Sequence, residues 1–148
     1  MRLDILFFES VGPFCADITP NELEAILGPA EEHFPVHKLD NELRQRVAEG
    51  EVNWMYPHST FYFVQDQLKE CAFAEHQQNQ LYLDGVNLDW TGNFVAQLKN
   101  DYPQYVEDVG FIEFVEIGLS LADFFDAEAE KVIRIFLDKE FYERPKDC

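Results

Sequence analysis

Positively charged residues are scarce in this chain. Lys and Arg number 11 against 29 Asp and Glu, so the formal net charge of the 148 residues is −18. A surface with this balance repels the phosphates of nucleic acids and the anionic surface of membranes, and it attracts basic partners. Direct binding to nucleic acid and binding to membranes are therefore disfavoured.

Cysteine is also sparse. The three cysteines, Cys15, Cys71 and Cys148, are odd in number and far apart, so they form neither a disulfide framework nor a metal-type pair. Such cysteine usage is typical of a reducing compartment, and we expect a cytoplasmic protein. No apolar run approaches the ~18 residues of a membrane span, and the first residues do not resemble a signal peptide.

The chain also lacks the common catalytic and cofactor-binding motifs. Its seven glycines are scattered and form neither a phosphate-binding loop nor a dinucleotide fingerprint, and no Gly-x-Ser-x-Gly elbow occurs. His33 and His37 are four residues apart, but Pro35 between them argues against the helix that would bring both to one metal ion. We therefore expect no cofactor, no metal site and no enzymatic activity.

Two other patterns have simpler explanations. The segment 84–89 carries three oxygen-bearing side chains but departs from the calcium-loop spacing, and a turn at Asp84-Gly85 explains it. Cys71 follows Glu70 and precedes two apolar residues, an environment that raises the pKa of a thiol. We expect a buried, inert cysteine rather than a nucleophile paired with His76.

Acidic and aromatic residues are abundant. From Glu70 to Glu130 there are thirteen carboxylates and one cation, Lys99, so this stretch supplies twelve of the eighteen net negative charges. Hydrophobic residues make up 47% of the chain and aromatic residues 15%, which suits a folded core and is unlike an acidic disordered chain.

Part of the acidic stretch mixes carboxylates with Trp and Tyr. Such a mixture suits a protein–protein interface, in which aromatic side chains anchor the partner and charges steer its approach. The alternative is a solvated acidic surface beside ordinary core aromatics. The candidate partner-binding residues are Asp84, Asp89, Trp90, Asp101, Tyr102, Tyr105, Glu107 and Asp108.

Local signals predict helices at three places. Thr19-Pro20-Asn21-Glu22 is a capping box with proline at the first helical position, which predicts a helix over 20–27. A second helix is expected over 41–49. Thr91 is expected to cap a third helix of about nine residues, with Phe94, Val95 and Leu98 facing inward.

Strands are predicted over the β-branched and aromatic runs of the chain. They are expected over 3–8, buried on both faces, and over 60–65, 70–76 and 110–119, with a hairpin over 81–88 that turns at Asp84-Gly85. The segment 51–59 is expected to be irregular. The segment 129–141 fits either a strand or a helix, and its apolar spacing, with Glu130 four residues before Arg134, favours the helix.

These elements together predict one α+β domain over residues 1–148. We expect a compact, mostly antiparallel sheet of about 4–6 strands packed by about 3–4 helices. The expected function is that of a non-enzymatic acidic protein that masks a basic protein surface, most concretely an immunity protein that neutralises a bacterial toxin such as a nuclease.

Two other functions stay open at this point. The chain could be a structural or regulatory domain of a larger assembly, with its acidity serving solubility and its many Phe side chains forming a self-associating surface. It could also be a hydrolase that uses paired carboxylates. The sequence leaves the oligomeric state open.

Overall fold

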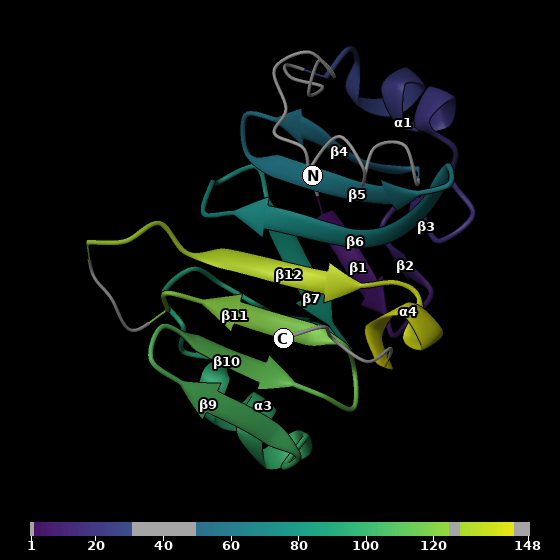
Figure 1. The fold of residues 1–148 in the computed structure, drawn as a ribbon. Coiled ribbons are helices and arrows are strands. Elements are labelled where there is room, and N and C mark those ends of the chain that lie inside the picture. The colour runs from purple at the N-terminus through teal and green to yellow at the C-terminus, as the bar shows by residue number, and fades with distance from the viewer. Residues whose placement is uncertain (1, 31–49, 125–127, 144–148) are drawn as a thin grey trace.

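Two β-sheets dominate the computed structural model, which describes residues 2–30, 50–124 and 128–143 (Figure 1). The sheets have five and seven strands, and the five-stranded sheet lies behind the seven-stranded one in this view. The helices in the described residues are short: α1 (Pro20–Leu27), α3 (Val95–Asp101) and α4 (Lys139–Glu143). The expected α+β domain, with one sheet packed by 3–4 helices, is therefore wrong, because the core lies between two sheets.

The five-stranded sheet contains the first strand of the chain. Its strands, in spatial order, are β3 (Phe14–Cys15), β2 (Ser10–Val11), β1 (Arg2–Leu6), β7 (Gln80–Leu83) and β8 (Val86–Asn87). β1 pairs in parallel with β7, with Leu3 opposite Leu81 and Ile5 opposite Leu83. Buried and exposed residues alternate along β1, so the prediction that this strand is buried on both faces is wrong.

The seven-stranded sheet is antiparallel throughout. Its strands, in spatial order, are β4 (Glu51–Tyr56), β5 (Ser59–Val64), β6 (Gln67–Ala74), β12 (Val132–Phe136), β11 (Leu119–Ala122), β10 (Phe111–Phe114) and β9 (Tyr105–Asp108). The strands expected over 60–65 and 70–76 are confirmed as β5 and β6, and the hairpin over 81–88 as β7 and β8.

The strand β12 overturns the helix favoured over 129–141. It pairs with β6 on one side and with β11 on the other. Ile133 and Ile135 are buried, and Arg134 between them points to the opposite face. Arg134 therefore forms its ion pair with Glu70 of β6 (2.6 Å) instead of supporting a helix with Glu130.

Two other strand predictions need correction, and one segment lies outside the described residues. The segment expected to be irregular contains β4, whose Trp54 pairs with Phe61 of β5. The single strand expected over 110–119 is instead two strands, β10 and β11, joined by a turn that contains Gly118. The helix predicted over 41–49 lies outside the described residues.

The capping signal predicted for α1 is present in the structure, whereas the one predicted for α3 is not. α1 has the predicted capping box, because the Glu22 N–H donates to the Thr19 hydroxyl (3.2 Å) and the Thr19 N–H donates to Glu22 (3.3 Å). Thr91 does not cap α3, since that helix starts at Val95 without a side-chain cap. The Thr91 N–H donates instead to the Asp89 carboxylate (2.9 Å). The inward positions predicted for this helix are nevertheless buried.

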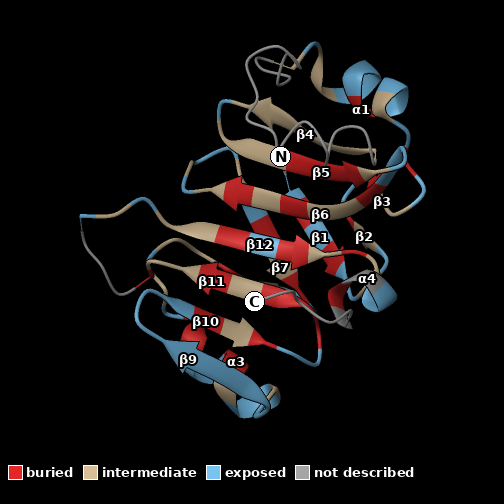
Figure 2. Cartoon of the chain, viewed as in Figure 1, coloured by how far each residue is buried: buried red, intermediate tan, exposed pale blue. Residues whose placement is uncertain are grey.

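The core fills the space between the two sheets, as the buried strand segments in Figure 2 show. Phe14 from the five-stranded sheet packs against Phe61 of the seven-stranded sheet, with ring centroids 4.8 Å apart. Phe73 joins the same cluster at 6.0 Å from Phe61. Burying each such ring contributes about 1.5–3 kcal/mol to stability. The other face of the seven-stranded sheet is left available for a surface site.

Candidate functional site

Five of the eight candidate residues lie around α3, and we call this group the acidic corner: Asp84, Asp101, Tyr102, Tyr105 and Glu107. The hydroxyl of Tyr102 donates to Asp84 (3.3 Å) in the turn between β7 and β8, and a hollow of 30 Å³ lies between these residues and Asp101. On the other side of the helix, Lys99 Nζ lies 2.9 Å from Glu107 Oε2 and 5.1 Å from the Tyr105 ring centroid. Contacts of α3 and the adjacent Tyr102 therefore link the β7–β8 turn to β9 in space.

Negative charge prevails at the acidic corner. Lys99 is neutralised by Glu107, whose hydrogen bond raises the pKa of the lysine. Burial raises the pKa of Tyr102, and the nearby charge of Asp84 raises it further. Within the described residues, Asp84 and Asp101 have no cationic partner, so their charges are available to a ligand.

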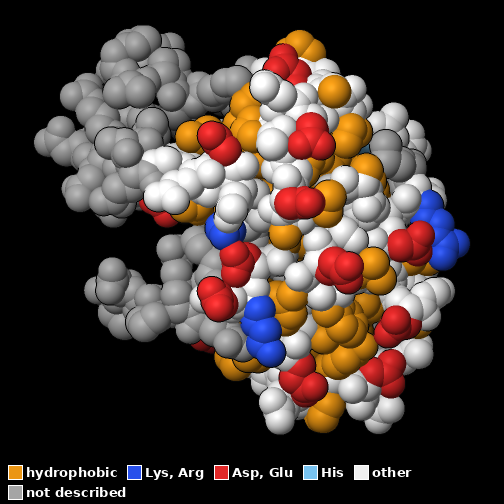
Figure 3. Space-filling view, turned by 90° about the vertical axis from the view of Figure 1, so that its right-hand side faces the viewer, with side chains coloured by type: hydrophobic (Ala, Val, Ile, Leu, Met, Phe, Trp, Pro, Cys, Tyr) orange, Lys and Arg blue, Asp and Glu red, His pale blue; other side chains and the backbone are white. Residues whose placement is uncertain are grey.

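Exposed apolar side chains lie beside these charges. The ring of Phe7 meets the ring of Tyr102 edge to face, with centroids 5.5 Å apart. The preceding residue, Leu6, is 52% exposed. Figure 3 shows a hydrophobic patch in the lower half of the molecule with acidic side chains around it. The combination of exposed apolar surface with surrounding charge is typical of a protein-binding surface.

Of the other three candidate residues, Trp90 and Asp89 make separate contacts, while Asp108 directly follows Glu107 of the acidic corner. Trp90 Nε1 donates to the backbone oxygens of His76 (3.2 Å) and Asn79 (3.1 Å), and its ring stacks on Phe124. These contacts give Trp90 a structural role. Asp89 accepts hydrogen bonds from the neighbouring Thr91. Asp108, at the end of β9, accepts the N–H of the next residue (2.7 Å).

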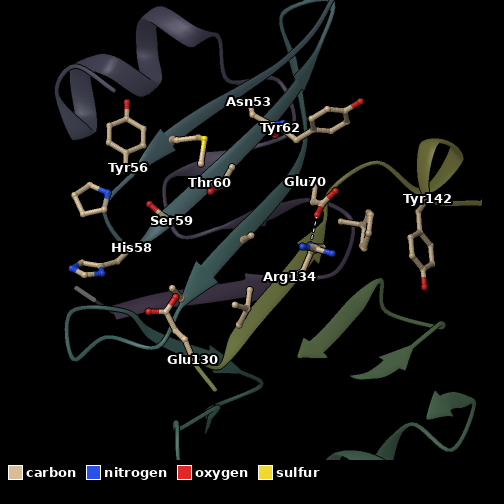
Figure 4. Close-up of a pocket in the computed structure, with 16 residues that line it drawn as sticks. Asn53, Tyr56, His58, Ser59, Thr60, Tyr62, Glu70, Glu130, Arg134 and Tyr142 are labelled. Atoms are coloured by element: carbon tan, nitrogen blue, oxygen red, sulfur yellow. Dashed lines mark ion pairs between the residues drawn. The ribbon is translucent and has the colours of Figure 1, made fainter. Parts of the chain in front are cut away.

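A groove of about 760 Å³ crosses the outer face of the seven-stranded sheet (Figure 4). Residues from β4, β5, β6 and β12 line it. The Glu70–Arg134 ion pair lies across its middle, while the His58 ring lies at the opposite end from Tyr142. The alternation of β6 could have placed Glu70 on this face, but its pairing with Arg134 depends on β12 being a strand.

Two tyrosines of the groove donate hydrogen bonds to carboxylates outside its lining. Tyr62 donates to Glu51, and Tyr142 donates to Glu113 (2.7 Å). Burial, together with the bond to Glu113, raises the pKa of Tyr142, so its phenol stays protonated at neutral pH. These bonds fix two tyrosines of the groove, and the Glu70–Arg134 ion pair neutralises its central carboxylate.

The described residues of the groove assemble no nucleophile with an adjacent base. The His58 ring stacks on His76, with centroids 3.8 Å apart, and no hydrogen bond joins it to Ser59 among the described contacts. Cys71 is fully buried, and burial, with Glu70 nearby, raises its thiol pKa well above the usual range. Within the described residues, no three His, Cys, Asp or Glu side chains are placed to hold a metal ion.

Two features thus stand out as candidate sites, and charge distinguishes them. The central carboxylate of the groove, Glu70, is neutralised by Arg134, whereas no described Lys or Arg pairs with Asp84 or Asp101 of the acidic corner. Comparison of the chain with protein-family models, with curated proteins and with solved structures finds no match. None of the described helices is long and apolar enough to cross a membrane.

Proposed function

We propose that this protein is a non-enzymatic binding protein that covers a basic surface of another protein with its acidic corner. The observation that carries the proposal is that Asp84 and Asp101, which have no cationic partner among the described residues, line one hollow with Tyr102, whose ring meets that of exposed Phe7. The carboxylates would steer a basic partner, and the aromatic rings would supply contact area on docking. The net charge of −18 extends the attraction beyond the contact itself.

The most concrete form of this function is an immunity protein, acting in the cytoplasm, that neutralises a bacterial toxin. A nuclease toxin fits best, because its substrate groove must be basic in order to hold phosphates. Acidic side chains in that groove would exclude the substrate and speed association with the toxin. A structural or regulatory domain remains the alternative, and it would show a defined oligomer and no basic partner.

The experiment is capture from a lysate of the source cell at low salt, followed by elution at high salt and mass spectrometry. We expect one basic protein, encoded beside this chain, with an affinity near the nanomolar range that weakens with salt. An empty eluate, or one that contains only copies of this chain, would contradict the proposal.

Isosteric variants of this chain, tested for binding to the captured partner, show which of its surfaces forms the interface. Asp84→Asn with Asp101→Asn removes two charges from the acidic corner, and asparagine also tolerates the positive φ of position 84 (+49°). Each exposed charge contributes about 0.5 kcal/mol, so association should slow about fivefold. The control pair, Asp17→Asn with Glu24→Gln, removes the same net charge elsewhere. An equal slowing by both pairs would contradict the placement at this corner.

A further inference from the structure

The strand β9 is an open edge of the seven-stranded sheet. All four of its residues are exposed, which is true of no other strand in the described part of the chain. It pairs with β10 on one side, and the strand order ends with it. Alternate backbone N–H and C=O groups of such a strand point away from the sheet and can accept a further strand.

The opposite edge of the same sheet differs. The residues of β4 are half-buried throughout. Tyr56 at its end donates a hydrogen bond to the Gly28 oxygen that follows α1 (3.0 Å). Gly28 therefore lies against the end of β4, whereas in the described part of the chain the strand order places no strand beyond β9.

The side chains of β9 make this edge acidic and partly apolar. Glu107 lies opposite Ile112, on the core-facing side of the sheet, and Asp108 lies opposite Phe111 on the outer side. Carboxylates are thus present on both faces of the strand. Val106 is 51% exposed, and Val109 in the following turn is 96% exposed. Natural sheet edges are often protected by Lys or Pro, and β9 contains neither residue.

We propose that β9 takes up an extended basic segment of the partner as an eighth, neighbouring strand. The inference rests on the proposed function and names how the partner is held. Backbone hydrogen bonds would supply affinity. Lys or Arg beside Asp108, and an apolar side chain beside Val106, would supply specificity through cross-strand pairs.

Charge favours a basic partner over a second copy of this chain. Pairing β9 with the β9 of another copy would bring Glu107 and Asp108 of both copies together, and each chain carries a net charge of −18. Like charges placed opposite each other destabilise a strand pair. In registers that place these carboxylates opposite each other, the repulsion disfavours self-association at this edge, whereas a basic strand meets no such repulsion.

A peptide of alternating Lys and Val, compared with the same peptide N-methylated at every backbone amide, tests the inference. Both peptides carry the same charge, but the methylated one has no N–H to donate. Each hydrogen bond lost should weaken binding roughly two- to tenfold, so we expect the methylated peptide to bind the intact chain at least about tenfold more weakly in calorimetry. Alternate β9 amides should gain protection from hydrogen exchange only with the unmodified peptide.

The possible outcomes distinguish backbone pairing at β9 from attraction by charge alone. Equal, salt-sensitive binding of the two peptides, without protection of β9 amides, would overturn strand addition and leave the basic-partner proposal standing. Absence of binding by the unmodified peptide would also overturn strand addition, while the capture experiment decides the basic partner separately. In the matched variant Glu107→Gln with Asp108→Asn, both peptides should weaken by the same factor, because only charge is removed.

Discussion

Gly118 in the turn between β10 and β11 lies directly against the Phe8 ring, which comes from the turn between β1 and β2. Its φ is +61°, and a Cβ added there would lie 2.6 Å from Phe8 Cε1 and 3.3 Å from Phe136 Cβ. The left-handed conformation costs about 1–2 kcal/mol for a residue with a side chain. Forcing a methyl group into packed side chains costs about 1–3 kcal/mol more. Gly118→Ala should therefore lower the free energy of unfolding by about 2–5 kcal/mol.

Gly85 in the β7–β8 turn provides the matched control. Its φ is also positive, at +81°, but an added Cβ would meet nothing within 4 Å. Gly85→Ala should therefore show the conformational cost alone, about 1–2 kcal/mol. Urea unfolding followed by Trp fluorescence measures both variants, and the transition midpoint should shift at an unchanged slope. Equal losses for the two variants would refute the close packing of Gly118 against Phe8.

Three further measurements test contacts described above. The pKa of Tyr142 is raised by burial and by Glu113, so the folded protein keeps a proton that the unfolded chain loses near pH ~10. Stability should fall as the pH rises above about 10, and urea unfolding should find a shallower fall in Tyr142→Phe. Cys71, with Cys15 and Cys148 replaced by Ser, should react with a thiol reagent only after unfolding; rapid reaction of the native protein would contradict its burial. Trp90→Phe removes the indole donor from the Asn79 and His76 oxygens, of which the His76 oxygen keeps the Asn79 N–H (3.0 Å). The lost partner of Asn79 should cost about 1–3 kcal/mol, and a loss below about 0.5 kcal/mol in thermal unfolding would contradict a structural role.

The elements that sequence patterns predicted well are those that form from neighbouring residues. The capping box of α1 joins Thr19 to Glu22, three positions away. The β7–β8 hairpin turns at Asp84-Gly85, where both φ angles are positive, and this residue pair suits such a turn. In each case the stabilising partner is a few residues distant, so a short window of sequence contains the cause.

The failures occurred where the deciding partner is remote in sequence. The apolar spacing of 129–141 is compatible with a helix, but β6 and β11 offer hydrogen bonds to both sides of β12. Tertiary pairing therefore overrides the helical pattern. The failure at Thr91 has a local cause instead, because nearby Asp89 binds its N–H and the helix starts at Val95.

The sequence predicted which residue types the candidate site contains, but it did not predict their arrangement in space. Acidic and aromatic residues between 84 and 108 are visible in the sequence, and α3 brings five of them together. Trp90 was grouped with them only because it is adjacent in the chain, whereas its ring packs on Phe124. The Glu70–Arg134 pair went unpredicted because it crosses two strands that are 64 positions apart.

The central place of β12 has a consequence for biosynthesis. A nascent chain that has reached Ala122 contains β4, β5 and β6 as one piece and β9, β10 and β11 as another. The strands β6 and β11 then face each other across a vacant position, with Phe73 and Leu121 and their backbone groups unprotected. Unpaired apolar edges of this kind favour aggregation during translation. The seven-stranded sheet can close only when residues 132–136 have left the ribosome, so β12, the last strand along the described chain, is the one that covers both edges.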